Sequence, residues 1–143
     1  MILDITSFEK ALIQLEESMM YCQSDLAKND AKLGTHLRAA AIQAFEFTYE
    51  LSFKMLKRYL EMTEPNPNAI DEMSFANIIR LANERGLLLS GIVSWKKYRE
   101  ERGATRHAYN EAKAEEVFSH IEDFMREAIY LSIRLTEKIK NVG

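Results

Sequence analysis

Apolar residues recur at intervals of three and four along three long stretches of this chain, which is the spacing of one face of an α-helix. The first stretch carries a single apolar stripe, and Thr6 followed by Glu9 has the pattern of a capping box at a helix start. Asn29 and Asp30 mark a turn after it. We therefore predict one amphipathic helix before that turn. Its stripe consists of Ile5, Phe8, Leu12, Leu15, Met19, Cys22 and Leu26.

The second stretch, residues 33–62, carries two apolar stripes. One consists of Leu37, Ala41, Ala44, Thr48, Leu51, Met55 and Tyr59, and the other of Ile42, Phe45, Tyr49, Phe53, Leu56 and Leu60. A narrow charged stripe lies between them, in which Glu50 and Lys54 have the spacing of a helical ion pair. A helix that is apolar over so much of its surface is buried on more than one side. We expect one side to face the core and the other a second copy of the chain, which predicts a homodimer.

Two shorter helices follow two prolines that end this stretch. The first is predicted to begin at about Ser74 and to end at Gly86, which suits a left-handed helix cap. We expect the leucines at 87–89 to enter the core. A second short helix is predicted to be capped by Ser90 and to end at Gly103.

The third long stretch runs from Asn110 or Ala112 to about Lys140, and its stripe is Ala114, Val117, Ile121, Phe124, Ala128, Leu131 and Leu135. No segment alternates with the period of two that a strand requires. The pattern predicts an all-α, up-and-down four-helix bundle with an additional short helix, forming a single domain over residues 1–143.

Composition and charge restrict the class of protein. The 143 residues, 47% of them apolar and 29% charged, suffice for one domain with a core. A net charge of −3 gives no general basic surface, so we expect no DNA partner. Cys22 is the single cysteine and, as a predicted core residue, fits a reducing compartment. The sequence lacks a signal peptide and an apolar run of about 20 residues, which predicts a cytoplasmic protein outside the membrane.

The chemistry of the chain is concentrated between Arg102 and Tyr109. Arginine presents a planar cation that suits phosphate oxygens, and His107 carries the side chain best suited to moving protons near neutral pH. The tyrosine adds a hydroxyl two residues after the histidine. A basic helix end is also typical of a solvated surface, since cations complement the helix dipole there. We expect Trp95 and Tyr98, just upstream, to be packing residues.

Metal and nucleotide sites are not predicted. Glu116, His120 and Asp123 share a face of the last helix, but Val117 stands where a carboxylate-bridged metal bundle requires Glu. We expect this face to be solvated. The chain has no phosphate-binding glycine loop and no nucleophile elbow, so we expect no cofactor or metal, and the chain is not predicted to be a nucleotidyltransferase itself.

Two motifs together carry a resemblance to a known family. The pattern Arg102-x4-His107-x-Tyr109 before the last helix, together with the stretch Gln43–Lys54 (QAFEFTYELSFK), resembles the HEPN superfamily. The similarity is to the branch of nucleotidyltransferase substrate-binding proteins that includes HepT-type toxins. It covers nearly the whole chain.

The resemblance implies a homodimeric four-helix bundle that binds a separately encoded minimal nucleotidyltransferase. It also implies a metal-independent ribonuclease in which Arg102 holds the scissile phosphate of RNA and His107 acts as a general acid or base. The tyrosine matching Tyr109 is implied to be adenylylated by the partner, which silences the toxin. Further contacts of the site or of the partner are expected at Glu46, Glu50, Lys54 and Arg106.

Gly103 departs from the family pattern, in which a polar residue often follows the arginine. A glycine cannot orient the arginine or the substrate through a side chain. Three functions therefore stay open: an RNase toxin, a non-catalytic subunit that presents a substrate to a nucleotidyltransferase, and a dimeric scaffold whose site has decayed.

Overall fold

The computed structural model describes residues 3–142 and, within them, contains helices and no strands. The helices are α1 (Thr6–Cys22), α2 (Asp25–Asn29), α3 (Ala31–Thr63), α4 (Pro67–Asp71), α5 (Phe75–Glu84), α6 (Ile92–Ala104), the 3₁₀-helix η1 (Thr105–His107) and α7 (Glu111–Val142). The predicted all-α bundle is confirmed. None of the described helices is long and apolar enough to cross a membrane.

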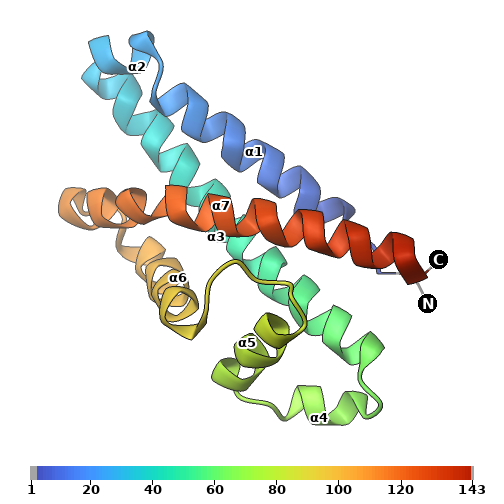
Figure 1. Ribbon diagram of the computed structural model, residues 1–143. Helices are drawn as coiled ribbons and strands as arrows, with labels where there is room; N and C mark the ends of the chain where they lie inside the picture. Colours follow the sequence, from blue (N-terminus) through green and yellow to red (C-terminus); the bar gives the residue numbers. More distant parts are fainter. Residues whose placement is uncertain (1–2, 143) are drawn as a thin grey trace.

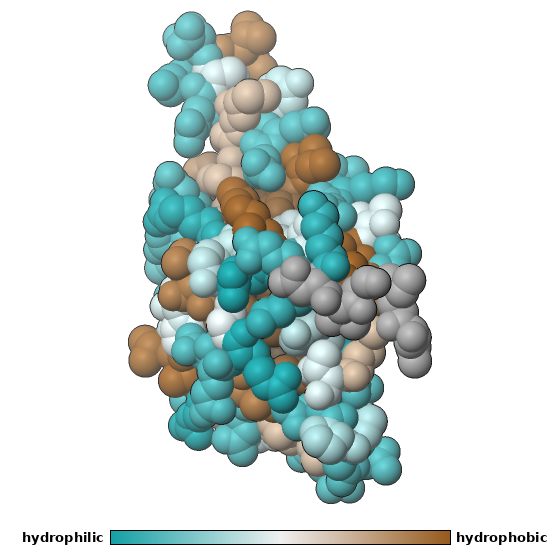
Figure 2. Space-filling model, turned by 45° about the vertical axis from the view of Figure 1, so that its right-hand side comes forward, coloured by the Kyte–Doolittle hydropathy of each residue, from teal (hydrophilic) through white to brown (hydrophobic). Residues whose placement is uncertain are grey.

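Helices α1 and α3 run antiparallel, and α2 forms the turn between them (Figure 1). Helix α7 crosses this pair and contacts both of its members. Helix α6 packs against α3 and α7, and α4 and α5 cover the C-terminal half of α3. The face shown in Figure 2 is mostly hydrophilic, with small separate apolar patches.

Helix α3 is the centre of the core. Its buried side chains are Ala41, Ile42, Ala44, Phe45, Thr48, Tyr49, Ser52, Met55, Leu56 and Leu60, which belong to both predicted stripes with the addition of Ser52. Helix α1 covers one side of α3, and α6 and α7 cover another. The chain thus buries most of both stripes by itself and leaves Leu37, Leu51, Phe53 and Tyr59 half-buried, so the double stripe alone does not require a second copy. Homodimerisation stays a prediction.

An aromatic cluster fixes α6 to the bundle. Trp95 is fully buried, and its ring centroid lies 6.2 Å from that of Tyr49 on α3 and 6.4 Å from that of Phe124 on α7. Tyr98 meets Phe124 edge to face at 5.4 Å, a favourable arrangement of aromatic rings. The prediction that Trp95 and Tyr98 are packing residues is confirmed. They set the position of the helix whose last turn carries Arg102.

The first predicted helix is two helices. Helix α1 ends at Cys22, and Ser24 caps α2 by accepting a hydrogen bond from the backbone N–H of Ala27. Leu26 is consequently 74% exposed, so its assignment to the apolar stripe was wrong. The capping box was also wrong, because the carboxylate of Asp4, not a side chain of the predicted pair, accepts from the N–H of Thr6.

The shorter helices agree in part with the prediction. Ser74 caps α5, and Gly86 follows that helix with a φ of 75°, in the left-handed region. Leu89 is 55% exposed, unlike the two leucines before it, and Gly91 takes the cap position of α6 that was predicted for Ser90.

Helix α4 was not predicted, because the two prolines were interpreted only as residues that end a helix. Pro67 stands in its first turn, where proline fits a helix.

Helix α6 also continues through Gly103, where the prediction ended it. A glycine inside a helix costs only about 1 kcal/mol relative to alanine. Thr105 offsets this cost because it is buried and its hydroxyl donates to the carbonyl of Arg102. Tertiary packing therefore decides where this helix ends.

A buried carboxylate fixes the connection between α5 and α6. Glu127 on α7 has no exposed surface, and its Oε2 accepts hydrogen bonds from the backbone N–H groups of Leu89 at 2.7 Å and Ser90 at 3.4 Å. Burial raises the pKa of this carboxyl above its ordinary value, although these hydrogen bonds act in the opposite direction.

Replacing Glu127 with Gln is expected to change how stability depends on pH. Because the pKa is raised in the folded state, the folded protein holds this proton more tightly than the unfolded chain does. The protonated carboxyl contributes fully to the free energy of unfolding below its unfolded-state pKa. This contribution is lost as pH rises through the folded-state pKa. Urea denaturation between about pH 4 and pH 8 should therefore show wild type losing stability relative to Glu127→Gln as pH rises.

Glu122→Gln provides the matched control, since Glu122 is an exposed carboxylate on the same helix. Its difference from wild type should vary less with pH. A Glu127→Gln difference that stays constant over the whole range would contradict the prediction.

Candidate active site

The motif singled out in the sequence lies where α6 passes into α7. Arg102 stands in the last turn of α6, His107 ends η1, and Tyr109 lies in the link before α7. Asn110 then caps α7, since its side chain accepts from the backbone N–H of Lys113. The burial of Trp95 on the preceding turns brings this end of α6 against α3.

Two carboxylates of α3 hold Arg102. Its guanidinium donates to Glu50 and lies 3.6 Å from Oε1 of Glu46, one helical turn away. The hydroxyl of Thr105, whose single proton can go either to the carbonyl of Arg102 or to this carboxylate, lies 3.1 Å from the other oxygen of Glu46. The hydrogen bond to Glu50 and the charges of both carboxylates raise the pKa of Arg102 further above its already high ordinary value. The arginine is thus fixed by α3 and stays charged.

The predicted ion pair between Glu50 and Lys54 does not form, because Glu50 turns to Arg102. Lys54 and Arg106 are both exposed, and neither has an ion-pair partner within residues 3–142. Of the four further residues expected at the site or at the partner surface, the structure brings Glu46 and Glu50 to Arg102. It leaves Lys54 and Arg106 facing solvent nearby on α3 and η1.

His107 and Tyr109 form a second, exposed group. Tyr109 is 88% exposed, and its ring centroid lies 6.3 Å from that of His107 at an interplanar angle of 67°. Over the described part of the chain, the imidazole of His107 has no hydrogen-bond or ion-pair partner, so its nitrogens are available to a ligand. No hydrogen bond joins the side chains of Arg102 and His107, which lie five residues apart in the described chain.

Two grooves lie in the neighbourhood of Arg102. One, of about 470 Å³, lies between the N-terminal half of α3 and the start of α7, and its lining includes His36, Arg38, Glu46 and Tyr109. The other, of about 480 Å³, lies between α3, α5 and α6, and Arg102 lines it. Arg102 does not line the first groove, which it adjoins only through Glu46 and Thr105.

Gly103 leaves open space beside the arginine. A Cβ placed there would meet no atom within 4 Å, so neighbouring atoms do not require a glycine at this position. The carboxylates of α3 orient Arg102 in place of a side chain at position 103.

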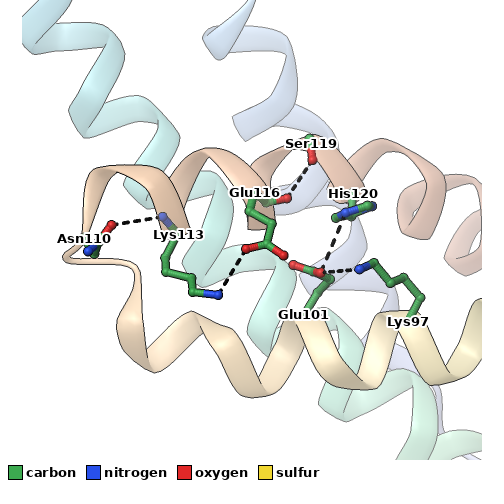
Figure 3. A network of polar contacts seen from close by, with 7 residues as sticks. All are labelled: Lys97, Glu101, Asn110, Lys113, Glu116, Ser119 and His120. Atoms are coloured by element: carbon green, nitrogen blue, oxygen red, sulfur yellow. Dashed lines mark hydrogen bonds and ion pairs between the residues drawn. The ribbon is translucent and has the colours of Figure 1, made fainter.

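The residue before Arg102 is Glu101, which points toward α7 (Figure 3), whereas Arg102 is held by α3. Glu101 is 3% exposed, and its Oε1 lies 3.2 Å from Nζ of Lys97 and 3.7 Å from Nε2 of His120 on α7. Glu116 and Asp123 are exposed, which agrees with the predicted solvated face, and His120 is half-buried against α6. Glu116 pairs with Lys113 on this face. Among the described residues, no cluster of three or more His, Cys, Asp or Glu side chains is arranged to hold a metal ion.

Sequence reasoning missed Glu101, Thr105 and Glu127, the buried polar groups around α6. Glu127 follows Phe124 by three residues and so has the spacing of the apolar stripe. This spacing was the signal from which its burial could have been predicted. Thr105 gave none, because its role depends on a carboxylate 59 residues earlier in the chain.

Comparison with known proteins places these features in a family. Residues 3–137 match the family model described as nucleotidyltransferase substrate binding protein like. A curated relative, the probable ribonuclease HepT of Haemophilus influenzae, is 34% identical over 132 residues, covering 92% of this chain and 86% of the relative.

A solved structure from Haemophilus influenzae, described as the substrate-binding domain of a nucleotidyltransferase, superposes with a TM-score of 0.88. It is 32% identical, and the match covers 93% of this chain and 99% of that one. The family model, the relative and the shared fold confirm the resemblance drawn from the Arg-x4-His-x-Tyr motif and the helix that holds its arginine: the chain belongs to the HepT-type branch of the nucleotidyltransferase substrate-binding proteins.

Proposed function

We propose that this protein is a HepT-like toxin: a homodimeric, metal-independent endoribonuclease that pairs with a separately encoded minimal nucleotidyltransferase. The observation that carries the proposal is Arg102, a cation that two carboxylates of α3 fix in place, that lines a groove and that lies five residues before an exposed histidine. The similarity to a probable ribonuclease HepT supports the same assignment.

The reaction uses the RNA's own 2′-hydroxyl. Its oxygen attacks the adjacent phosphorus, the bond to the 5′-oxygen breaks, and the products carry a 2′,3′-cyclic phosphate and a 5′-hydroxyl. His107 takes the proton of the 2′-hydroxyl or supplies one to the leaving oxygen. Arg102 faces the phosphate and stabilises the negative charge that develops in the transition state.

We propose that two copies of the chain together form the complete active site. Within the described part of one copy, no hydrogen bond joins the side chains of Arg102 and His107, and His107 is exposed. A second copy brings another arginine and histidine to the same cleft, so that one histidine can act as the base and another as the acid. Lys54 and Arg106, both exposed, add positive charge to the RNA path.

Tyr109 is the proposed switch. Its phenol is 88% exposed, as the acceptor of a group transferred by another enzyme must be. The phenolic oxygen attacks the α-phosphorus of ATP in the partner's active site, pyrophosphate leaves, and the phenolic proton passes to a base of the partner. The added adenylyl group brings bulk and negative charge next to His107 and excludes RNA.

A second candidate is a non-catalytic subunit that presents a substrate to the nucleotidyltransferase. The description of the similar solved structure as a substrate-binding domain favours it. The two candidates differ in whether the purified protein cleaves RNA.

Purified protein is expected to cleave single-stranded RNA in the presence of EDTA, and His107→Ala should lower the rate by about a hundredfold or more, the usual contribution of a general acid or base. Product analysis should find 2′,3′-cyclic phosphate ends. Circular dichroism and gel filtration of each variant establish that fold and assembly are unchanged.

His120→Asn is the matched control, because His120 lies on α7 next to Glu101, outside the proposed site, and the variant should retain cleavage. Cleavage that persists in a folded His107→Ala protein contradicts the assigned role. A wild-type protein that cleaves none of several RNAs favours the substrate-presenting subunit.

Incubation with the partner nucleotidyltransferase and ATP is expected to add at least one adenylyl group per chain, detected by mass spectrometry, and to abolish RNA cleavage. Tyr109→Phe should block the addition because it lacks the acceptor oxygen. Tyr21→Phe should be modified like wild type, since Tyr21 is also exposed but lies on α1. Modification of Tyr109→Phe to the wild-type extent would assign the acceptor to another residue.

A further inference from the structure

The groove between α3, α5 and α6 has a lining that the proposed cleavage step does not use. Its floor is aromatic and apolar, with Tyr49, Phe53 and Phe75, and its edge carries the cations Lys57, Arg99 and Arg102. Arg102 thus belongs both to the phosphate site and to this groove. A surface with planar apolar groups on its floor and cations at its edge matches a nucleotide, whose base is planar and whose phosphate is anionic.

Three planar side chains in this groove form a short stack. The rings of Phe53 and Phe75 lie 5.4 Å apart with an interplanar angle of 29°, and the guanidinium of Arg99 lies over Phe75, 4.6 Å from the ring centroid. The two phenylalanines are half-buried and Arg99 is exposed. RNA bases that are not paired commonly stack on aromatic rings and on guanidinium planes.

The charges at the groove edge differ in their pairing. Arg102 is held by Glu46 and Glu50, and Nζ of Lys57 lies 3.6 Å from Asp71. Arg99 has no carboxylate within ion-pair distance among residues 3–142. An uncompensated guanidinium over an aromatic ring, in the same groove as Arg102, is available to both the face of a base and a phosphate.

Gly103 leaves space for a ligand in this groove. It lines the groove, and a Cβ at this position would meet no atom within 4 Å. A larger side chain would therefore occupy the groove next to Arg102 without displacing its neighbours.

We infer that this groove is a subsite for one nucleotide of a single-stranded RNA next to the scissile phosphate, with its base continuing the Arg99–Phe75–Phe53 stack and its phosphate at Lys57 and Arg102. The inference rests on the proposed ribonuclease function and extends it to a preference for unpaired RNA. A duplex cannot present a base to this stack, because its bases are already stacked and paired.

The test measures binding separately from cleavage. The probe is a fluorescent oligoadenylate of about twelve nucleotides with 2′-O-methyl riboses, which cannot be cleaved, and the reference is an abasic chain of the same length and charge. Wild type should bind the oligoadenylate about 5- to 100-fold more tightly than the abasic chain, the range expected for stacking of one base. Phe75→Leu and Arg99→Gln should reduce this ratio toward one.

Two matched controls are needed. One separates base stacking from the loss of a positive charge, and the other separates blocking of the groove from a general effect of replacing glycine with leucine. Arg58→Gln removes an exposed cation of α3 that does not line the groove, so any loss should affect both probes equally. Gly103→Leu should weaken oligoadenylate binding at least tenfold, whereas Gly91→Leu should not, although a Cβ at Gly91 also meets no atom within 4 Å. Circular dichroism confirms that each variant is folded.

The outcomes distinguish this subsite from the ribonuclease function itself. Wild type that cleaves RNA but shows the same binding ratio in Phe75→Leu, Arg99→Gln and Gly103→Leu overturns the subsite and leaves the function standing. Binding of free AMP that Gly103→Leu abolishes, without binding of oligoadenylate, overturns RNA as the occupant. Wild type that neither binds nor cleaves RNA overturns both.

Discussion

The burial of Trp95 between α3 and α7 is the interaction on which the candidate site depends. An indole ring removes a large apolar area from water, and here it does so at the crossing of three helices. It sets the distance between the last turn of α6 and the carboxylates of α3. Without that distance Arg102 could not reach Glu46 and Glu50 together.

The carboxylates give Arg102 an unusual setting for the phosphate ligand that we propose it to be. Glu46 and Glu50 compensate much of its charge and also face the region where a phosphate would bind. Attraction of an anion must therefore come from the surrounding cations without carboxylate partners, which include Arg99 on α6 and Arg106 on η1. In this arrangement the carboxylates orient the ligand-binding group, and other residues supply the long-range field.

The sequence allowed the fold to be predicted well and the site only in outline. Three- and four-residue spacing identified the three long helices because the periodicity of an amphipathic helix is local information. Residue types also placed a helix start at about Ser74 and a left-handed residue at Gly86, since both depend on the local backbone. Family resemblance supplied the motif from Arg102 to Tyr109, which periodicity does not distinguish from a basic helix end.

What could not be predicted depends on residues far apart in the sequence. The extent of α6 is set by Thr105 and its contact with α3, which overrides the weak helix propensity of Gly103. The buried Glu127 serves backbone groups of a loop 38 residues earlier. The double stripe of α3 was interpreted as a subunit interface because a sequence does not show how many neighbours its own chain provides.

The adjacent acidic and basic residues at 101 and 102 have a consequence for motion. Glu101 is drawn toward α7 and Arg102 toward α3, from neighbouring positions about 100° apart around the axis of α6. These two contacts, one with α7 and one with α3, prevent α6 from turning about its own axis. Any rotation that shortens one contact lengthens the other. The guanidinium is consequently held in one orientation before any ligand arrives, and little conformational entropy of α6 is lost when it binds.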